Sequence, residues 1–185
     1  SKEEILERIN NNTITDILNK IEVKAGDVVM VKAGTIHAIG AGVFICEIQQ
    51  NSNCTYRMYD YDRRDKFGNP RELHVKKALD VVDNHKYIKD NKTEVVIARN
   101  EHFTEERLVQ CKYFEVYKYD VNDEAKITVD EASFVSVLFI NGSGTIETDD
   151  YEKTMEFKAG DSFFVSAGLR SIIIKGQATM VVTRI

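Results

Sequence analysis

His37, Glu47 and Arg57 are the residues of this sequence whose types and spacing suit chemistry on a small ligand. They lie ten positions apart, in or beside short runs rich in Val, Ile, Phe, Tyr and Thr. A neutral imidazole is a good zinc ligand. A carboxylate can ligate a metal or accept a proton, and a guanidinium can hold a carboxylate, a phosphate or a developing oxyanion. If the runs are successive strands of a meander, the three side chains converge on one barrel interior.

Plainer interpretations of the same residues remain open. A single histidine after a glycine turn is more often a surface or packed residue than a ligand. Glu47 and Arg57 fit an ordinary cross-strand ion pair equally well. The charged run at residues 60–65 fits a solvated loop, and the other histidines have no ligand spacing and are expected at the surface.

The elements that must position these residues are mainly β. Residues 1–22 carry apolar positions at helical spacing, which predicts a short helical lead-in, and a second short helix is expected at 73–80. From residue 23 onward, β-branched and aromatic runs alternate with Gly, Asn and Asp, as in a sandwich or barrel. The expected strands cover residues 28–31, 43–50, 55–61, 93–98, 114–119, 125–129, 134–141, 144–148, 162–165, 171–175 and 178–183.

An internal repeat indicates two such β units. The tetrapeptide Lys-Ala-Gly-Asp occurs at 24–27 and at 158–161, and each copy is followed at the same spacing by Val, Ala and Gly. A Gly-Asp turn, a strand and a second Gly turn is how a jelly-roll barrel reverses direction. His37 of the first copy corresponds to Ser171 of the second. We therefore expect one barrel with a partial metal site and one without a metal ligand.

The resulting expectation is a cupin-type jelly-roll chain in three parts. Residues 1–22 form the helical lead-in, 23–100 the first barrel and 101–185 the second. The net charge of -5 and the lack of a Lys/Arg stripe argue against nucleic acid as a partner. No apolar run reaches the roughly 20 residues that a membrane span requires. Three cysteines without CxxC spacing fit reduced thiols in a cytoplasmic protein.

Three segments resemble a known family. They read AGTIHAIGAG at residues 33–42, EIQQNSNCTYRMYDYDR at 47–63 and GNPRELHVKKAL at 68–79. They resemble the type I, zinc-dependent mannose-6-phosphate isomerases, most closely the short bacterial form. The resemblance implies interconversion of mannose 6-phosphate and fructose 6-phosphate through a cis-enediol, with zinc as the Lewis acid and a phosphorylated hexose as the substrate.

The same resemblance implies roles for the three residues. His37 matches the family's last zinc-ligand histidine, Arg57 matches its catalytic arginine, and Glu47 matches its glutamate near the substrate. Arg57 would then stabilise the enediolate, and Glu47 would act as a base or support the metal.

The family's other zinc ligands have no counterpart before His37. We therefore expect that the N-terminal part of the enzyme is missing, through truncation or because a partner supplies it. One imidazole gives weak coordination, so the chain alone should bind zinc poorly and have little isomerase activity. The alternative is a non-catalytic sugar-binding or regulatory cupin module. An oxygenase-type cupin would need a clustered His-x-His and Glu motif, which the sequence lacks.

Overall fold

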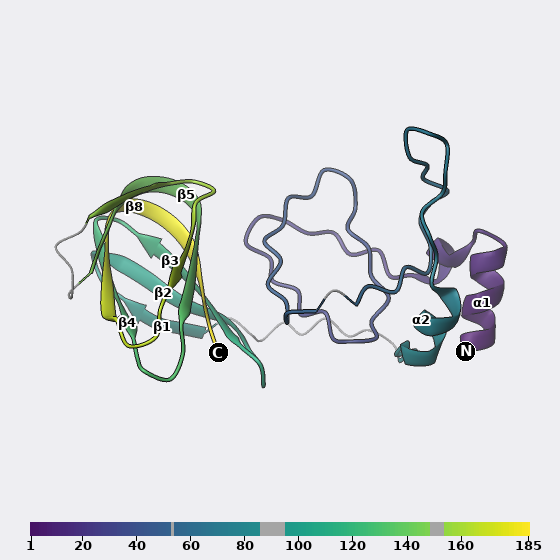
Figure 1. Ribbon diagram of the computed structural model, residues 1–185, viewed down its shortest axis with the longest axis horizontal. Helices are drawn as coiled ribbons and strands as arrows, with labels where there is room; N and C mark the ends of the chain where they lie inside the picture. Colours follow the sequence, from purple (N-terminus) through teal and green to yellow (C-terminus); the bar gives the residue numbers. More distant parts are fainter. Residues whose placement is uncertain (53, 86–94, 149–153) are drawn as a thin grey trace. The chain divides into compact units, whose positions relative to one another are not determined.

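The computed structural model describes residues 1–52, 54–85, 95–148 and 154–185, and it divides into two compact units, Ser1–Lys89 and Asp90–Ile185 (Figure 1). The first unit contains α1 (Lys2–Asn10), the 3-10 helix η1 (Ile14–Ile17) and α2 (Val75–Val81), while all the described strands belong to the second. None of the helices in the described ranges has the length and hydropathy that crossing a membrane requires.

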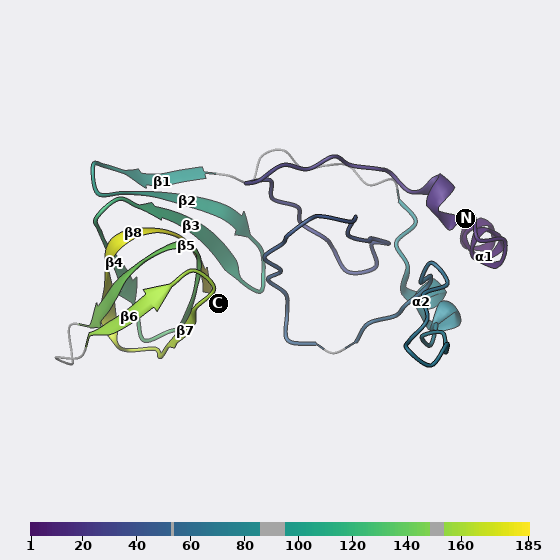
Figure 2. The same ribbon diagram turned by 90° about the horizontal axis from the view of Figure 1, so that it is seen from above.

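The second unit is an antiparallel sheet that rolls up around a common interior (Figure 2). Its main path runs β1-β2-β3-β8-β5-β6, with β4 paired to β8 and β7 paired to β5. The mainly β, cupin-type expectation is confirmed for this unit. The strands are β1 (Val95–Arg99), β2 (Phe103–Gln110), β3 (Glu115–Val121), β4 (Glu124–Val129), β5 (Val135–Thr148), β6 (Met155–Lys158), β7 (Ser162–Val165) and β8 (Arg170–Arg184).

Two long strands, β5 and β8, close the roll by pairing with different neighbours at their two ends. Residues 172–175 of β8 lie between β4 and β5, and residues 178–184 lie between β3 and β5. The sequence predicted four shorter strands here, with breaks at the glycines. Instead, Gly144 pairs with Gly176, and a Cβ at Gly144 would overlap the Lys175 carbonyl oxygen. Glycine therefore lets the two backbones approach at a corner, and it does not end either strand.

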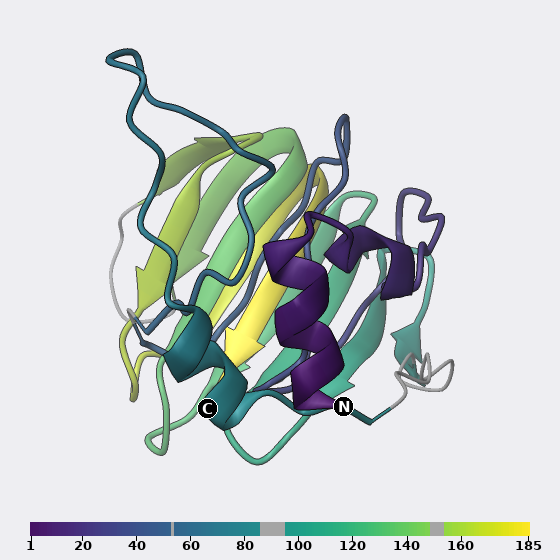
Figure 3. The same cartoon turned by 90° about the vertical axis from the view of Figure 1, so that its right-hand side faces the viewer.

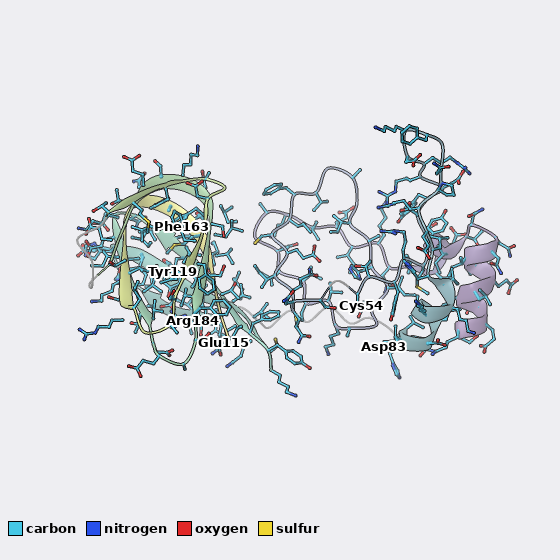
Figure 4. All side chains as sticks on the ribbon, in the orientation of Figure 1. Cys54, Asp83, Glu115, Tyr119, Phe163 and Arg184 are labelled. Atoms are coloured by element: carbon cyan, nitrogen blue, oxygen red, sulfur yellow. The ribbon has the colours of Figure 1, made fainter. Side chains whose placement is uncertain are left out.

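The interior of the second unit is filled by the alternating residues of these strands. In β4, buried and exposed residues alternate strictly, as expected for a sheet with one face toward the core. Phe139 is fully buried, and its ring stacks on that of Phe157 with centroids 3.7 Å apart. Phe163 packs edge-on against Phe139, and Tyr119 is 2% exposed within the same core (Figure 4).

The internal repeat appears as two turns of the same geometry. Gly26 has φ +92 and Gly160 has φ +91, a backbone region that L side chains rarely adopt. In each turn the Asp N–H donates to the Lys carbonyl at 3.1 Å, and the Asp carboxylate accepts from the Lys N–H, at 3.2 Å in the first copy and 2.9 Å in the second. Residues 24–27 and 158–161 therefore encode the same local structure.

The first unit is organised by its helices. Ser1 caps α1, because its hydroxyl oxygen accepts the Glu4 N–H at 3.3 Å. The two α-helices contact each other and lie side by side (Figure 3). Their apolar faces, with η1, form a small second core of Ile5, Ile9, Ile14 and Val82, against which Val75 and Leu79 pack. The helical lead-in and the helix expected at 73–80 are thus both present, the latter at Val75–Val81.

The strands expected at 28–31, 43–50 and 55–61 are not formed. The described residues between η1 and α2 contain no strand, apart from an isolated bridge between Arg64 and Pro70. A strand exists only where a neighbour satisfies its backbone. After the second copy of the repeat turn, β7 pairs with β5. Residues 28–31 follow the equivalent turn of the first copy, but no strand in the described part of the chain pairs with them. That residues 23–100 can form a barrel stays a prediction, as do the three domain bounds.

Candidate functional site

His37 lies in a loop that follows the repeat motif and is tied to the end of α2. The Gly34 carbonyl accepts the Asp83 N–H at 2.9 Å, which fixes the start of this loop. The imidazole is exposed, and its Nδ1 lies 2.9 Å from the Thr35 carbonyl oxygen. A carbonyl oxygen only accepts, so the proton of the neutral ring is assigned to Nδ1. Nε2 then keeps the lone pair that a metal ligand needs.

Glu47 and Arg57 differ in how firmly they are held. Glu47 is exposed within a stretch that forms neither helix nor strand. Arg57 is partly buried and is bound to the segment before α2. The backbone N–H of Arg57 donates to the His74 ring at Nδ1, at 3.3 Å, and the backbone carbonyl of Arg57 accepts the backbone N–H of His74 at 2.7 Å. In the side chain, Arg57 Nη1 donates to the Glu72 carbonyl at 3.3 Å.

The predicted convergence of His37, Glu47 and Arg57 on one cavity stays a prediction. Within the described ranges, no hydrogen bond or ion pair joins any two of the three, and no group of three or more His, Cys, Asp or Glu side chains is placed to hold a metal ion. The part of the site that the structure does define is the surroundings of Arg57.

Those surroundings contain a buried carboxylate that sequence reasoning missed. Residues 60–65 fit a solvated loop, but Asp60 is only 6% exposed. Arg71 donates to both of its carboxylate oxygens, with Nε 2.7 Å from Oδ2. Arg63 Nη2 lies 3.1 Å from Oδ1, and Arg57 Nε lies 4.0 Å from Oδ1. The Arg71 hydrogen bonds, together with the charges of the other two arginines, lower the pKa of Asp60.

A turn at residues 65–69 brings Arg71 back to Asp60. The Asp65 carboxylate accepts the N–H groups of Phe67 and Asn69, at 2.8 and 2.9 Å, and the Asp65 N–H donates to the Asn69 carbonyl. This is a side-chain-stabilised turn of the kind that Asp favours. Its sequence, DKFGN, was the one available signal that the chain reverses between Asp60 and Arg71.

A separate hollow lies in the second unit. It is lined by the β2–β3 turn, the β4–β5 loop and the chain end, including Lys112, Phe134 and Arg184. The Arg184 guanidinium lies over the Tyr117 ring, 5.2 Å from its centroid, and its buried Nε has no hydrogen-bond partner among the residues that the structure describes. Glu115 and Arg184 are directly paired residues of β3 and β8 (Figure 4). None of the three predicted site residues lines this hollow.

Comparison with known proteins covers the whole chain. A sequence model described as "Mannose-6-phosphate isomerase, cupin domain" matches residues 104–185. The chain is 42% identical over 190 residues to the protein YvyI of Bacillus subtilis (strain 168) and 33% identical over 195 residues to the mannose-6-phosphate isomerase ManA of the same organism. Each alignment covers 100% of this chain and 57% of the relative.

A solved structure agrees with these matches. The crystal structure of the mannose 6-phosphate isomerase from Bacillus subtilis aligns with a TM-score of 0.89 and 39% sequence identity, covering 100% of this chain and 57% of that one. The chain therefore spans a little over half the length of the relatives it matches. In sequence and in fold, this chain is similar along its whole length to part of the mannose-6-phosphate isomerases, and its residues 104–185 match the cupin domain of that family.

Proposed function

We propose that the chain forms the C-terminal part of an isomerase that interconverts mannose 6-phosphate and fructose 6-phosphate. The observation that carries this proposal is the similarity along the entire chain, which includes the segments around His37 and Arg57 and is not confined to the cupin fold. A shared fold alone would not support an activity. A match that extends over candidate site residues and scaffold together does support one.

The reaction moves a proton between C1 and C2 of the sugar through a cis-enediol. Such a reaction needs a base near the reacting carbon and a positive group near the oxygens that gain charge. In this proposal Arg57 donates to the enediolate oxygen, because a guanidinium stays charged and presents several N–H donors, of which one is bound to Glu72. Glu47 supplies the carboxylate, as the base or as a partner of the metal site.

Zinc, when bound, would polarise the sugar carbonyl as a Lewis acid. His37 fits one ligand position, because the Thr35 carbonyl holds Nδ1–H and leaves Nε2 available. A catalytic zinc site typically needs three protein ligands, and the part of the chain that the structure describes offers no such group. We propose that the remaining ligands come from the region of the relatives that this chain does not cover, and that residues 23–100 close into a barrel with that region.

A second candidate is a sugar-binding or regulatory cupin module without catalysis. The incomplete ligand set within the described ranges favours this function for the chain by itself. The two candidates differ in one measurement, since a binding module takes up mannose 6-phosphate without converting it. In either case we propose a cytoplasmic protein, because Cys46 and Cys54 are free and exposed, as is usual in a reducing compartment.

The test is an isomerase assay with mannose 6-phosphate and added zinc. We would assay this chain alone and co-produced with the part of ManA from Bacillus subtilis that it does not cover. The expected result is activity and bound zinc in the assembled pair, and little of either in the chain alone. A His37→Ala variant of the assembled pair should lose both. Full zinc retention in that variant would remove His37 from the site, and an assembled pair that binds sugar phosphate without turnover would favour the binding module.

A further inference from the structure

Asp60 stands apart from the other charged residues of the chain. Among the charged residues in the described ranges, only Asp60 is buried, with 6% of its surface exposed. Burying a carboxylate is costly unless it is paired and hydrogen-bonded. Three guanidinium groups, those of Arg57, Arg63 and Arg71, surround it. One buried carboxylate therefore lies among three guanidinium groups and attracts all of them.

The three arginines contact Asp60 in different ways. Arg71 binds it through a two-pronged contact to both oxygens, the geometry in which Arg and carboxylate pair most specifically. Arg63 contacts Asp60 from the solvent side, because its own side chain is 63% exposed. Arg57 is 28% exposed, and its Nε is 4.0 Å from Oδ1, beyond hydrogen-bond reach. Asp60 thus attracts Arg57 through charge without taking up its N–H donors.

Arg57 is fixed from a second direction by the segment that Arg71 begins. Its Nη1 donates to the Glu72 carbonyl at 3.3 Å, and its backbone exchanges hydrogen bonds with His74. The Asp60–Arg71 pair joins the two stretches of chain between which the Arg57 side chain lies. Losing this pair would release the start of the segment at 71–74, and loss of the Asp60 carboxylate would remove the charge that orients the guanidinium.

We propose that Asp60, clasped by Arg71, is a positioning residue that holds the Arg57 guanidinium in one orientation for the sugar reaction. This inference rests on the proposed function, because it assigns Asp60 a role only through Arg57. Asp60 itself is only 6% exposed, and its two oxygens are engaged by Arg71 and Arg63, so we assign it no direct contact with the substrate. Fixed orientation matters because a small misplacement of a charge-stabilising group lowers the rate of the chemical step more than it lowers binding.

The kinetic test uses the assembled pair with mannose 6-phosphate as the substrate. Asp60→Asn keeps the shape but removes the charge, and kcat should fall about 10- to 100-fold while KM changes less than about threefold. Arg71→Gln should give the same loss, and Arg71→Lys, which keeps the charge but not the two-pronged contact, a smaller one. The double variant Asp60→Asn with Arg71→Gln should be no worse than Asp60→Asn, because both remove the same clasp.

The same loop supplies a matched control. Asp62 and Arg64 form an exposed ion pair at 2.8 Å, with side chains 74% and 52% exposed. Asp62→Asn removes an equivalent charge two residues away, and it should leave kcat and KM within about twofold of the parent protein. A loss of kcat in this control equal to that of Asp60→Asn would overturn the proposal, because any charge change in the loop would then have the same effect.

A spectroscopic test needs no activity and uses the 185-residue chain alone. The Arg57 Nη1–H resonance, assigned with an Arg57→Lys variant, should be slow to exchange in the parent chain, where it donates to the Glu72 carbonyl, and fast in Asp60→Asn, with Asp62→Asn as the control. An unchanged Arg57 resonance in Asp60→Asn overturns the proposal. So does full kcat in Asp60→Asn when Arg57→Gln is inactive. An inactive parent pair contradicts the proposed function instead, and the resonance still decides whether Asp60 holds Arg57.

Discussion

Gly144 lies at the corner where β5 and β8 approach each other, and Gly144→Ala should destabilise the second unit much more than Gly160→Ala. A Cβ at Gly144 would overlap the Lys175 carbonyl oxygen and would lie 3.0 Å from both the Lys175 carbonyl carbon and Phe157 Cζ. Gly160 has open space around it, but its φ is +91. The two substitutions therefore separate steric overlap from backbone strain.

The expected magnitudes follow from these environments. Ala in a left-handed conformation costs about 1–2 kcal/mol, of which reduced freedom of the unfolded chain offsets about 0.4–1 kcal/mol. Gly160→Ala should therefore cost about 1 kcal/mol. At Gly144 the overlap is relieved only if β5 separates from β8, where Gly144 pairs with Gly176 and Thr145 with Lys175. Two lost ladder hydrogen bonds cost about 1–3 kcal/mol, and pressure on the Phe157 ring adds about 1–3 kcal/mol.

Thermal unfolding provides the measurement. The chain has no tryptophan, so far-UV circular dichroism and tyrosine fluorescence should follow the transition. In a unit of roughly 100 residues, each kcal/mol lowers Tm by about 4–8 °C. Gly160→Ala should lower Tm by that amount, and Gly144→Ala by at least about twice as much. Gly26→Ala, in the first copy of the same turn, should leave the transition of the second unit unchanged. Equal losses for Gly144→Ala and Gly160→Ala would refute the steric argument.

Two further predictions concern side chains of the second unit. Asp123 accepts from His102 Nδ1 at 2.9 Å and raises the pKa of His102 above its ordinary 6.5, while His102 lowers the pKa of Asp123 below its ordinary 3.8. The stability from this pair is complete between the two ordinary values, and it is lost as pH rises through the raised histidine pKa or falls through the lowered aspartate pKa. His102→Gln should thus lower the urea midpoint near about pH 5.5 but not near about pH 9, and an equal deficit at both would contradict the assignment. Tyr119 donates to Glu105 Oε1 at 2.6 Å, so Tyr119→Phe should cost about 1–3 kcal/mol in urea unfolding, whereas Tyr113→Phe, at an exposed ring, should leave the midpoint unchanged.

The sequence led to Arg57 but not to the residues that hold it. Arg57 stood out because it lies ten residues after Glu47, in a segment that resembles a known family. Asp60 and Arg71 are eleven residues apart and meet only because a turn folds the chain back. No periodicity of strand or helix relates such a pair, and a charged residue in a charged run looks solvated until its neighbours are placed.

Strands, like the Asp60–Arg71 pair, depend on partners that are distant along the chain, and this limited their prediction from the sequence. The prediction at 162–165 is confirmed by β7, where apolar and small residues are bounded by turns. Strand β2 was missed, because Glu105, Glu106 and Arg107 hide its alternation, and its first six residues are only partly buried on both faces. It is a strand because β1 and β3 bind it on either side. Pairing, and not propensity, decided its structure.

By itself, the sequence determined the local features of this protein: the two Lys-Ala-Gly-Asp turns, the amphipathic helices and the strand-rich second half. These depend on contacts within a few residues, so the residue types are enough to specify them. The tertiary structure alone decided which strand-like runs became strands and which charges became buried. Both outcomes require partners that are distant along the chain, since a backbone N–H or a buried carboxylate is stabilised only when its partner arrives.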